Sequence, residues 1–312
     1  MTTNLSYFME IVKYGSFSTA ATNLGISQPA LSGYIRKLEK SLGIVLFDRS
    51  VNPVQLTAQG QAYLEYATKQ AKLEEAFYNQ IHDIEGEAYG TITIGGAVTS
   101  NICYLPAVVA AFKADFPHID LKVIDGKVPD IARMAANDEV DFFFTPTKVN
   151  QDAFEYEPLL FEDLLFCVPP MWKLNERWQS HRLDPKNFDK EPYGGPLRPA
   201  TTYIHDLPFI LLEEGVEVRK ISEDIFTELG TRPKSFMTVG QVITAINMTV
   251  QGAGVTFAPE TVLRMGNFET LPEMYPLELR SARRSMYVCY KKTHYMSRAA
   301  AEFINLLKKT FS

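Results

Sequence analysis

A group of small, polar and basic residues near the start of the chain has the composition of a nucleic-acid contact. All but one member of the group lie within residues 16–43, and Arg49 follows shortly after. Short polar side chains can approach base edges, whereas arginine and lysine reach phosphate oxygens. The residues that we expect to contact double-stranded DNA are Ser27, Gln28, Pro29, Ala30, Ser32, Gly33, Arg36, Lys37 and Arg49.

A helix from about residue 28 to residue 42 must position most of these side chains. Ser27 is a favourable N-cap, and Pro29 fits the first turn because its missing N–H has no partner there. Gly33 costs about 1 kcal/mol relative to alanine, and it either permits close approach to DNA or is merely tolerated. A solvated basic surface helix remains the alternative for this pattern taken alone. The apolar residues that share one face of the predicted helix are Leu31, Ile35, Leu38 and Leu42.

The residues before this helix favour a helix-turn-helix. Ala20 and Ala21 have almost no side chain, so another helix can cross closely over them. Ser18 can cap a short helix over residues 19–24, and Gly25 provides the turn that follows.

A wing is predicted after the helix-turn-helix. Residues 45–47 and 54–56 have the composition of short strands on either side of a turn at Asn52 and Pro53. Arg49 in this wing is the expected phosphate contact.

The charge of the chain is divided unevenly. The net charge is −6, which by itself argues against a nucleic-acid partner. Residues 1–60 carry +2, however, and residues 61–312 carry −8. A slightly basic head therefore precedes an acidic body.

A second group of polar residues follows strands of an alternating strand–helix region after residue 89. Ligands bind beyond the carboxyl ends of parallel strands, and the N–H groups at a helix N-terminus favour an anion such as a carboxylate. Helix capping is the alternative role for the first two residues of this group. The candidate ligand contacts are Thr99, Ser100, Asn101, Thr145, Pro146 and Gln241.

Enzymatic and metal chemistry find no support in the motifs. The sequence has no nucleophile elbow, P-loop, zinc-protease helix or paired-cysteine motif. The five histidines are scattered without ligand spacing. We expect no catalytic residue, no metal and no cofactor. The three cysteines, Cys103, Cys167 and Cys289, are expected to be buried and reduced, with a redox switch as the alternative.

The residues of the predicted helix-turn-helix and wing make the chain resemble the LysR-type transcriptional regulators. A second stretch, MTVQGAGVTFAPE (residues 248–260), is similar to a signature of the family's effector domain. The residues of the first window that carry the resemblance are Ala20, Ala21, Leu24, Ser27, Gln28, Pro29, Ala30, Leu31, Ser32, Ile35, Leu38, Glu39, Leu42, Gly43, Leu46, Phe47, Arg49, Leu56, Thr57 and Gly60.

The resemblance implies a fold and a domain organisation. It implies a winged helix-turn-helix domain over residues 1–58 and a linker helix for dimerisation over 59–88. A two-lobed α/β effector domain of the type 2 periplasmic-binding-protein kind follows over 89–312. Lobe I is expected at about 89–160 and 266–312, and lobe II at about 161–265. Two segments, near 159–168 and 259–270, are expected to cross between the lobes. The sheets of both lobes are expected to be mostly parallel.

Two departures from the family pattern are visible. The wing has Asn52 where a second basic residue is frequent, so one phosphate contact is expected to be missing. Residues 170–206 are longer than the usual connection, and either an extended surface loop or a lid over the cleft would account for them.

The long helix predicted over residues 58–86 needs a partner, because the small head alone cannot cover its apolar stripe. The resemblance implies a homodimer through this helix, and a tetramer of such dimers. We therefore expect a cytoplasmic regulator that binds promoter DNA. A small effector is expected to shift the protein between two conformational states. Since helix N-termini favour negative charge, this effector is expected to be an anion. RNA polymerase is a further expected partner, and a membrane is not.

Two other protein classes are alternatives to this hypothesis. A solute-binding protein without a gene-regulatory role would carry a secretion signal and no DNA-reading head, and the sequence shows the opposite. An enzyme of two α/β lobes is the third class.

Overall fold

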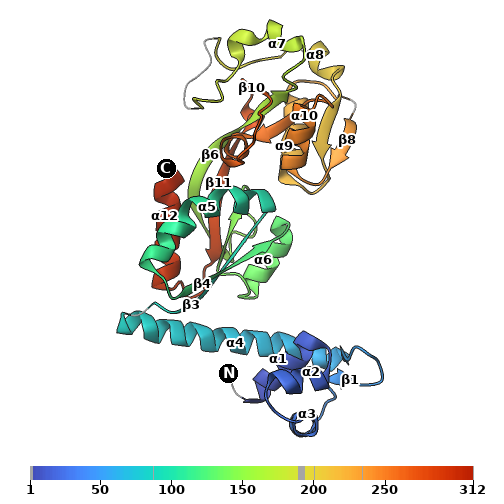
Figure 1. Cartoon of the computed structure of the whole chain (residues 1–312), viewed down its shortest axis with the longest axis vertical. Coiled ribbons are helices and arrows are strands. Elements are labelled where there is room, and N and C mark those ends of the chain that lie inside the picture. Colours follow the sequence, from blue (N-terminus) through green and yellow to red (C-terminus); the bar gives the residue numbers. More distant parts are fainter. Residues whose placement is uncertain (1–2, 87, 189–193, 200, 234, 312) are drawn as a thin grey trace. The chain divides into compact units, whose positions relative to one another are not determined.

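A computed structural model describes residues 3–86, 88–188, 194–199, 201–233 and 235–311. It divides into two compact units, Met1–Gly90 and Thr91–Ser312 (Figure 1). Among the described residues, no helix is both long enough and apolar enough to cross a bilayer.

The first unit contains three short helices, a two-stranded wing and one long helix. Its elements are α1 (Thr3–Tyr14), α2 (Phe17–Asn23), α3 (Gln28–Leu42), β1 (Phe47–Asp48), β2 (Gln55–Leu56) and α4 (Ala58–Glu85).

Two serine caps fix where the short helices begin. Ser27 Oγ accepts a hydrogen bond from the Ala30 backbone N–H at 3.4 Å, as predicted. The predicted cap at Ser18 is wrong. Ser16 caps α2 instead and accepts from the Thr19 N–H at 3.3 Å. The helix begins earlier because Phe17 is buried in the core of the unit.

One apolar core holds the three short helices together. Ala20 and Ala21 are fully buried, which confirms that small side chains permit a close crossing here. Leu42 was expected on the buried face but is 44% exposed, because α3 has passed the core by its last turn. The largest members of the core are Leu5, Phe8, Ile11, Phe17, Leu31, Ile35, Leu38, Leu46 and Phe47.

The wing is present but shorter than predicted. β1 and β2 pair antiparallel, with Phe47 opposite Leu56. The start of α4 presses against this wing at Gly60, where an added Cβ would lie 2.0 Å from the backbone oxygen of Leu46. Only glycine fits at this crossing.

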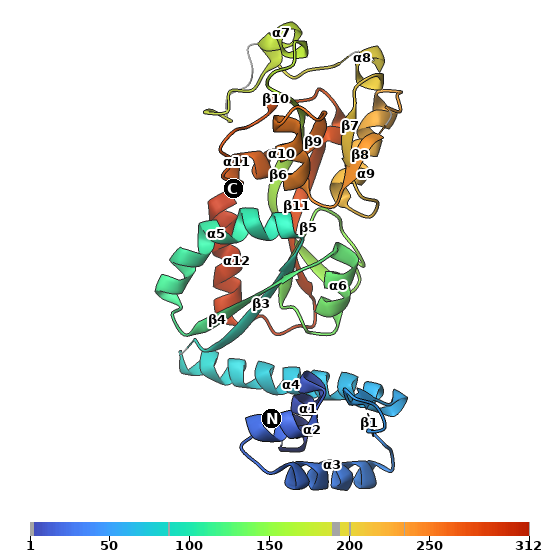
Figure 2. The same ribbon diagram turned by 45° about the vertical axis from the view of Figure 1, so that its right-hand side comes forward.

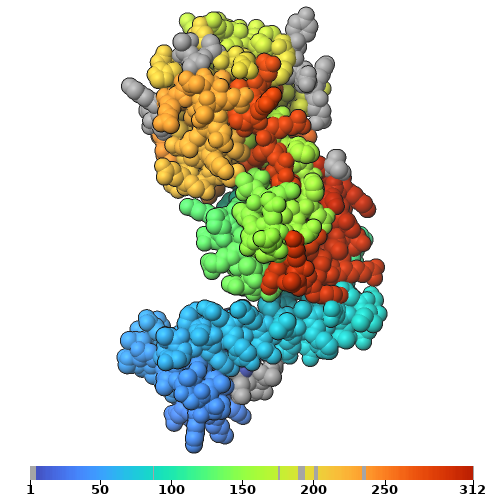
Figure 3. Space-filling view, turned by 180° about the vertical axis from the view of Figure 1, so that it is seen from behind, coloured from blue at the N-terminus to red at the C-terminus, as the bar shows by residue number. Residues whose placement is uncertain are grey.

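The helix predicted over residues 58–86 is present as α4. Thr57 caps it, with its Oγ1 accepting from the Gly60 N–H at 2.9 Å. Its first turns pack on the head, where Tyr63 meets Phe8 edge to face at 4.8 Å. Its later turns form a band that the rest of its own unit leaves uncovered (Figure 3). The large apolar side chains exposed on α4 are Tyr66, Leu73, Phe77, Tyr78 and Ile84.

The second unit is an α/β structure of two lobes (Figure 2). The first half of its chain contributes β3 (Gly90–Gly96), α5 (Val98–Asp115), β4 (Ile119–Asp125), α6 (Val128–Ala136), β5 (Phe142–Thr145) and β6 (Phe154–Val168). The second half contributes β7 (Phe209–Leu212), α9 (Glu217–Glu228), β8 (Ser235–Val239), α10 (Val242–Val250), β9 (Thr256–Pro259), α11 (Glu260–Met265), β10 (Glu273–Tyr275), η2 (Arg280–Ala282), β11 (Arg283–Lys291) and α12 (Arg298–Phe311).

The main sheet is mixed rather than mostly parallel, which corrects the prediction. Its strand order is β10-β6-β11-β5-β3-β4, with β9 also paired to β6. β3 and β5 are parallel, whereas β11 runs antiparallel to both β5 and β6. The returning strand β11 therefore lies between strands from much earlier in the chain.

The long strand β6 carries the chain from one lobe to the other. Its first half pairs with β11, and its second half pairs with β9 and β10. The predicted crossing at 159–168 is thus part of one continuous strand. The return was expected near 259–270, but β10 pairs with residues 166–168 of lobe II. The chain regains lobe I only along β11, so residues 266–282 belong with lobe II.

The described parts of residues 170–206 form a structured extension of lobe II. It includes α7 (Leu174–Arg177), η1 (Gln179–His181) and α8 (Thr201–His205). Trp178 packs edge to face on Phe166 and Tyr275, and the Leu183 N–H donates to the Met274 oxygen at 2.8 Å. This packing explains how a long connection keeps a fixed place against β6 and β10.

Candidate functional site

The outer face of α3 is the first candidate site. The residues at its N-terminal end, from Ser27 to Ala30, are all exposed, and so are Arg36 and Lys37 further along. Gly33 lies between them and is half-buried. The sequence-predicted residues thus share one surface of one helix, with small polar groups at its N-terminal end and cations beyond them.

Ser32 does not belong to that surface, which corrects its prediction as a direct contact. It is only 4% exposed, and its Oγ accepts a hydrogen bond from Gln28 Nε2 at 3.0 Å. The amide of Gln28 lies over the hydroxyl because residues four apart share a helix face. Ser32 can therefore act only by orienting Gln28.

The Arg49 side chain is held in place by contacts with Glu39 and Phe17. Its Nη2 donates to Glu39 Oε2 at 2.9 Å, and its guanidinium lies 4.9 Å from the centre of the Phe17 ring. Glu39 Oε1 also accepts from the Leu46 N–H at 2.9 Å. The Arg49 side chain is 34% exposed and directly follows the wing strand β1.

The second candidate site is a cleft of about 450 Å³ between the two lobes of the second unit, a volume typical of small-molecule sites. Lobe I contributes the starts of α5 and α6, and lobe II contributes the starts of α9 and α10. The floor is made where β6, α11 and β11 meet. No residue of the described parts of 170–206 lines this cleft, so the lid hypothesis for that segment finds no support there.

Four of the six predicted cleft residues line it: Thr99, Ser100, Pro146 and Gln241. The capping role that was left open for Thr99 and Ser100 is excluded, because α5 begins at Val98 and its N-cap is Ala97, which makes no side-chain bond. Both hydroxyls instead stand in the first turn of the helix.

Asn101 and Thr145 do not line the cleft, and their prediction is corrected. Asn101 is buried, and its Nδ2 donates to Asp125 Oδ1 at 2.8 Å. The hydroxyl of the fully buried Thr145 donates to the Thr147 oxygen at 2.7 Å. Both side chains hold the wall of the cleft together from behind.

An ion pair that the sequence analysis missed lies on the floor. Arg284 Nε donates to Glu162 Oε1 at 2.8 Å, and the Glu162 side chain is 3% exposed. Burial works against the charged form of Arg284, but the Glu162 carboxylate outweighs it and raises the pKa of the guanidinium. Glu162 Oε2 has no hydrogen-bond partner among the described residues. No local signal could have shown this pair, since its members are 122 positions apart.

Two further groups on the floor are held neutral. Burial raises the pKa of the Cys103 thiol to about 12, and the nearby Glu162 adds to the effect. Burial likewise raises the pKa of Tyr104 well above its usual value. A protonated thiol is a poor nucleophile, so the redox alternative finds no support at Cys103.

Charged residues at the mouth of the cleft were also missed. Asp125 and Lys127 come from lobe I, and Glu213 and Glu217 come from lobe II. They lie in loops and first helical turns, where charges are common on any surface, so the sequence alone could not distinguish them.

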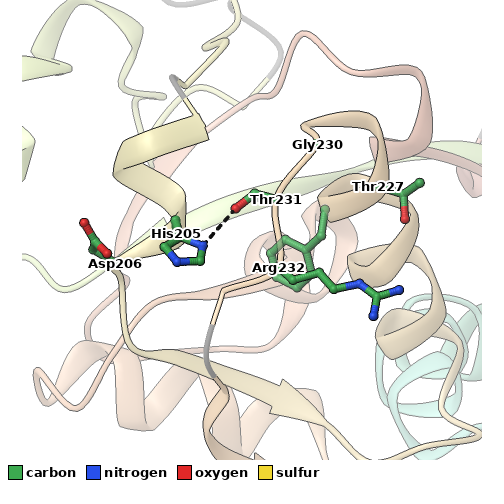
Figure 4. A pocket seen from close by; sticks show the side chains of 7 residues that line it. His205, Asp206, Thr227, Gly230, Thr231 and Arg232 are labelled. Atoms are coloured by element: carbon green, nitrogen blue, oxygen red, sulfur yellow. Dashed lines mark hydrogen bonds between the residues drawn. The ribbon is translucent and has the colours of Figure 1, made fainter.

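A larger hollow of about 600 Å³ lies on lobe II beside α8 and α9 (Figure 4). Its only drawn contact is between His205 Nδ1 and Thr231 Oγ1, 3.5 Å apart. Asp206 and the guanidinium of Arg232 point away from that pair. These groups do not converge on a common point, and no group of three metal-ligating side chains was found among the described residues.

Comparison with known proteins assigns both units to sequence families. Residues 2–61 match the family described as bacterial regulatory helix-turn-helix protein, lysR family. Residues 85–312 match the LysR substrate binding domain. The chain is 29% identical over 315 residues to the uncharacterized HTH-type transcriptional regulator YcgK of Bacillus subtilis, covering 98% of this chain and 95% of that protein. It is 26% identical over 313 residues to the transcriptional dual regulator GltC of the same organism, covering 99% and 96%.

Solved structures share the fold. A full-length OxyR variant from Pseudomonas aeruginosa superimposes with a TM-score of 0.69 at 18% identity, covering 99% of this chain and 94% of that chain. Full-length CbnR in complex with its target DNA gives 0.68 at 19% identity, with 98% of each chain covered.

Proposed function

Because this chain belongs to the LysR family of transcriptional regulators, we propose that α3 and the wing contact promoter DNA and that the cleft of the second unit binds a small effector. The observation that carries the first part is the outer face of α3. Its N-terminal end is small, polar and exposed, and Arg36 and Lys37 extend the same surface. A recognition helix of this kind lies in a major groove with its N-terminal residues at the base edges.

Related structures support this assignment of the head. CbnR, whose fold this chain shares, is known in complex with its target DNA. A solute-binding protein without a gene-regulatory role is not favoured, because such a protein has no use for the head. A regulator of promoters works where the DNA is, which supports a cytoplasmic location.

A homodimer follows from the exposed band on α4. Leu73, Phe77 and Ile84 leave a large apolar surface in water, and a second copy of the same helix would cover it. Two heads related by a twofold axis suit a dyad-symmetric DNA site. Pairing of such dimers into a tetramer and contact with RNA polymerase are further parts of the proposal.

The cleft supplies the regulatory input. A ligand that contacts both lobes stabilises one arrangement of the lobes over the other, and it can shift the population only by its difference in affinity for the two. No reaction is required of the protein, so we propose that it is not an enzyme and needs no cofactor besides the effector.

A gel shift with the full-length protein and a fragment of its own promoter tests the assignment of the head. Arg36→Ala should weaken binding to promoter and unrelated fragments alike and should reduce the salt dependence, because a phosphate contact is lost. Gln28→Ala should instead change which sequence is preferred, by about 1–3 kcal/mol if a base contact is lost.

Lys72→Ala serves as the matched control, since this cation lies on α4 away from the α3 surface and pairs with Glu75 at 2.9 Å. It should leave both properties unchanged. Unaltered affinity and unaltered preference in both α3 variants would contradict the assignment of this helix.

A further inference from the structure

Four helix N-termini meet at the cleft without side-chain caps. The N-cap residues of α5, α6, α9 and α10 are Ala97, Lys127, Val216 and Gln241, and none makes a capping hydrogen bond. All four line the cleft. The backbone N–H groups of these first turns are therefore left for water or a ligand, and they favour negative charge.

The first unit shows that this chain does use caps elsewhere. Ser16, Ser27 and Thr57 each accept a backbone N–H at the start of α2, α3 and α4. Two short 3-10 helices away from the cleft, η1 and η2, also start without a side-chain cap, so the contrast holds between the α-helices that begin at the cleft and those of the first unit.

The side chains that line the cleft carry a net negative charge, opposite in sign to the partial positive charge of the helix N-termini. Four carboxylates line it, those of Asp125, Glu162, Glu213 and Glu217, against the two cations Lys127 and Arg284. Glu162 and Arg284 neutralise each other, so the remaining charge is negative. An effector with only negative charge would be repelled by this excess.

Glu162 provides a specific point of attachment for a hydrogen-bond donor. Its Oε1 is taken by Arg284, whereas its Oε2 is buried at the cleft floor with no partner among the described residues. A buried carboxylate oxygen left without a donor destabilises the protein, because the atom has lost its water without gaining another partner. A ligand N–H that reaches this atom would remove that destabilisation.

The charged residues on the two walls of the cleft differ. Lobe I brings Lys127 with the hydroxyls of Thr99 and Ser100, and also Asp125, whose Oδ1 already accepts a hydrogen bond from Asn101 Nδ2. Lobe II brings the carboxylates Glu213 and Glu217, with no cation of its wall among the lining residues. Glu217 lies close enough to Arg284 for its charge to contribute to the raised pKa of the guanidinium.

We propose that the effector is a zwitterion of amino-acid type. Its carboxylate lies at the N-terminus of α5, beside Ser100 and Lys127, and its ammonium group faces lobe II and donates to Glu162 Oε2. This inference rests on the proposed function of the cleft. It replaces the simple anion expected from the helix terminus alone with a molecule that carries both charges.

Such a ligand connects the lobes because each end is attracted to a different one. The lobes already approach at the rim, where a Cβ added to Gly215 of lobe II would lie 4.0 Å from Lys127 Nζ of lobe I. A purely anionic molecule would meet the carboxylates of Glu213 and Glu217 where it approaches lobe II. The zwitterion therefore has the differential affinity for the closed arrangement that regulation requires.

A thermal-shift screen of the full-length protein with the twenty common amino acids tests the proposal. A ligand that binds only the folded state raises the midpoint of unfolding with concentration. The best amino acid is then compared with two matched probes, the carboxylic acid that lacks its amino group and the amine that lacks its carboxylate. We expect the amino acid to bind at least about tenfold more tightly than either probe, since each probe lacks one charge-assisted contact.

Two variants locate the ends of the ligand. Glu217→Gln should weaken binding of the amino acid by about tenfold and should leave the affinity of the matched carboxylic acid unchanged or increased, because only the amino group faces this carboxylate. Ser100→Ala should weaken both. Glu214→Gln is the control, since Glu214 is an exposed neighbour that does not line the cleft, and its affinities should equal those of the unaltered chain.

Failure of the zwitterion proposal can be distinguished from failure of the proposed function. Binding of the carboxylic acid as tight as that of the amino acid, or no shift with any of the twenty compounds, overturns the zwitterion. Selective DNA binding in the gel shift would persist in either case if the regulator assignment holds. Should Glu217→Gln fail to fold, as judged by its melting midpoint without ligand, Glu213→Gln removes the other carboxylate of lobe II, and its effect decides in the same way.

Discussion

Single residues decide how closely the head can approach its surroundings. Gly33 and Gly60 both lie in helices, but their environments differ. A Cβ at Gly33 would meet no atom within 4 Å, whereas one at Gly60 would lie 2.0 Å from the Leu46 oxygen. Gly33 therefore has no packing role within its unit, and Gly60 is required where α4 crosses the wing.

We predict opposite effects of alanine at these two glycines. Gly33→Ala should stabilise the head by up to about 1 kcal/mol, because glycine costs this much in a helix interior. If Gly33 permits close approach to the groove, the same change should weaken DNA binding. Gly60→Ala should destabilise the head by ~1–3 kcal/mol through overpacking. Urea unfolding followed by far-ultraviolet circular dichroism measures both. A more stable Gly60→Ala protein would contradict the packing described at the wing.

His294 couples the second unit to pH. Its Nε2 lies 2.9 Å from Asp141 Oδ1 and its Nδ1 lies 3.3 Å from Asp138 Oδ1. Burial opposes the charged form, but the two carboxylates outweigh it and raise the pKa of the imidazole. The folded state therefore holds this proton more tightly than the unfolded chain does.

Stability from His294 should be fully present below the unfolded pKa of about 6.5 and should be lost as pH rises through the raised value. Both tryptophans, Trp172 and Trp178, belong to the second unit, so their fluorescence reports its unfolding. We expect the urea midpoint to fall as pH rises above about 6.5. His294→Gln should remove much of this slope, and replacing the exposed His118 by Gln should not. An unchanged slope in His294→Gln would refute the pairing.

Sequence reasoning at this scale succeeded where the determinants are local. The Ser27 cap and the alanine pair depend on neighbours within a few positions, and the structure has both as predicted. The burial of Ser32 and the Glu162–Arg284 pair depend on three-dimensional packing. Nothing in the spacing of these residues could reveal them.

The long helix α4 is the element whose surface is least explained by its own unit. Its predicted bounds were confirmed within one residue, because a cap, an amphipathic pattern and Gly86 mark both ends. Its exposed apolar residues lie mostly in the second half, beyond the turns that pack on the head.

We expect Phe77→Glu to shift the full-length protein toward the monomer, because a charge would be buried in a helix–helix contact. Gln70→Glu places the same charge at an exposed polar position of the helix and should leave the dimer intact. Sedimentation velocity at several concentrations measures the proportions of monomer and dimer in each variant. A Phe77→Glu protein that remains dimeric would show that this band is not the dimer contact.

The sheet of the second unit shows the limit of prediction for elements. Strands β3, β5 and β7 were expected from their apolar runs. The antiparallel place of β11 was not, because its partners in β6 lie more than a hundred residues earlier. That strand carries Arg284 to the cleft floor, so missing it also meant missing part of the site.

At the scale of the whole molecule, the two units divide the work of a regulator. The head offers an exposed reading surface, and the second unit offers a cleft whose walls come from two lobes. The family of each unit could be predicted from motifs, since the turn, cap and glycine signatures are local. The chemistry of the ligand could not, because the cleft gathers residues from both halves of the second unit.

Competition for DNA tests the central claim most directly. Full-length protein at low ionic strength is bound to a labelled fragment of its own promoter and challenged with unlabelled promoter or with a scrambled fragment of equal length and composition. The account predicts that the unlabelled promoter displaces the label at a far lower concentration than the scrambled fragment does. Equal displacement by the two would contradict it.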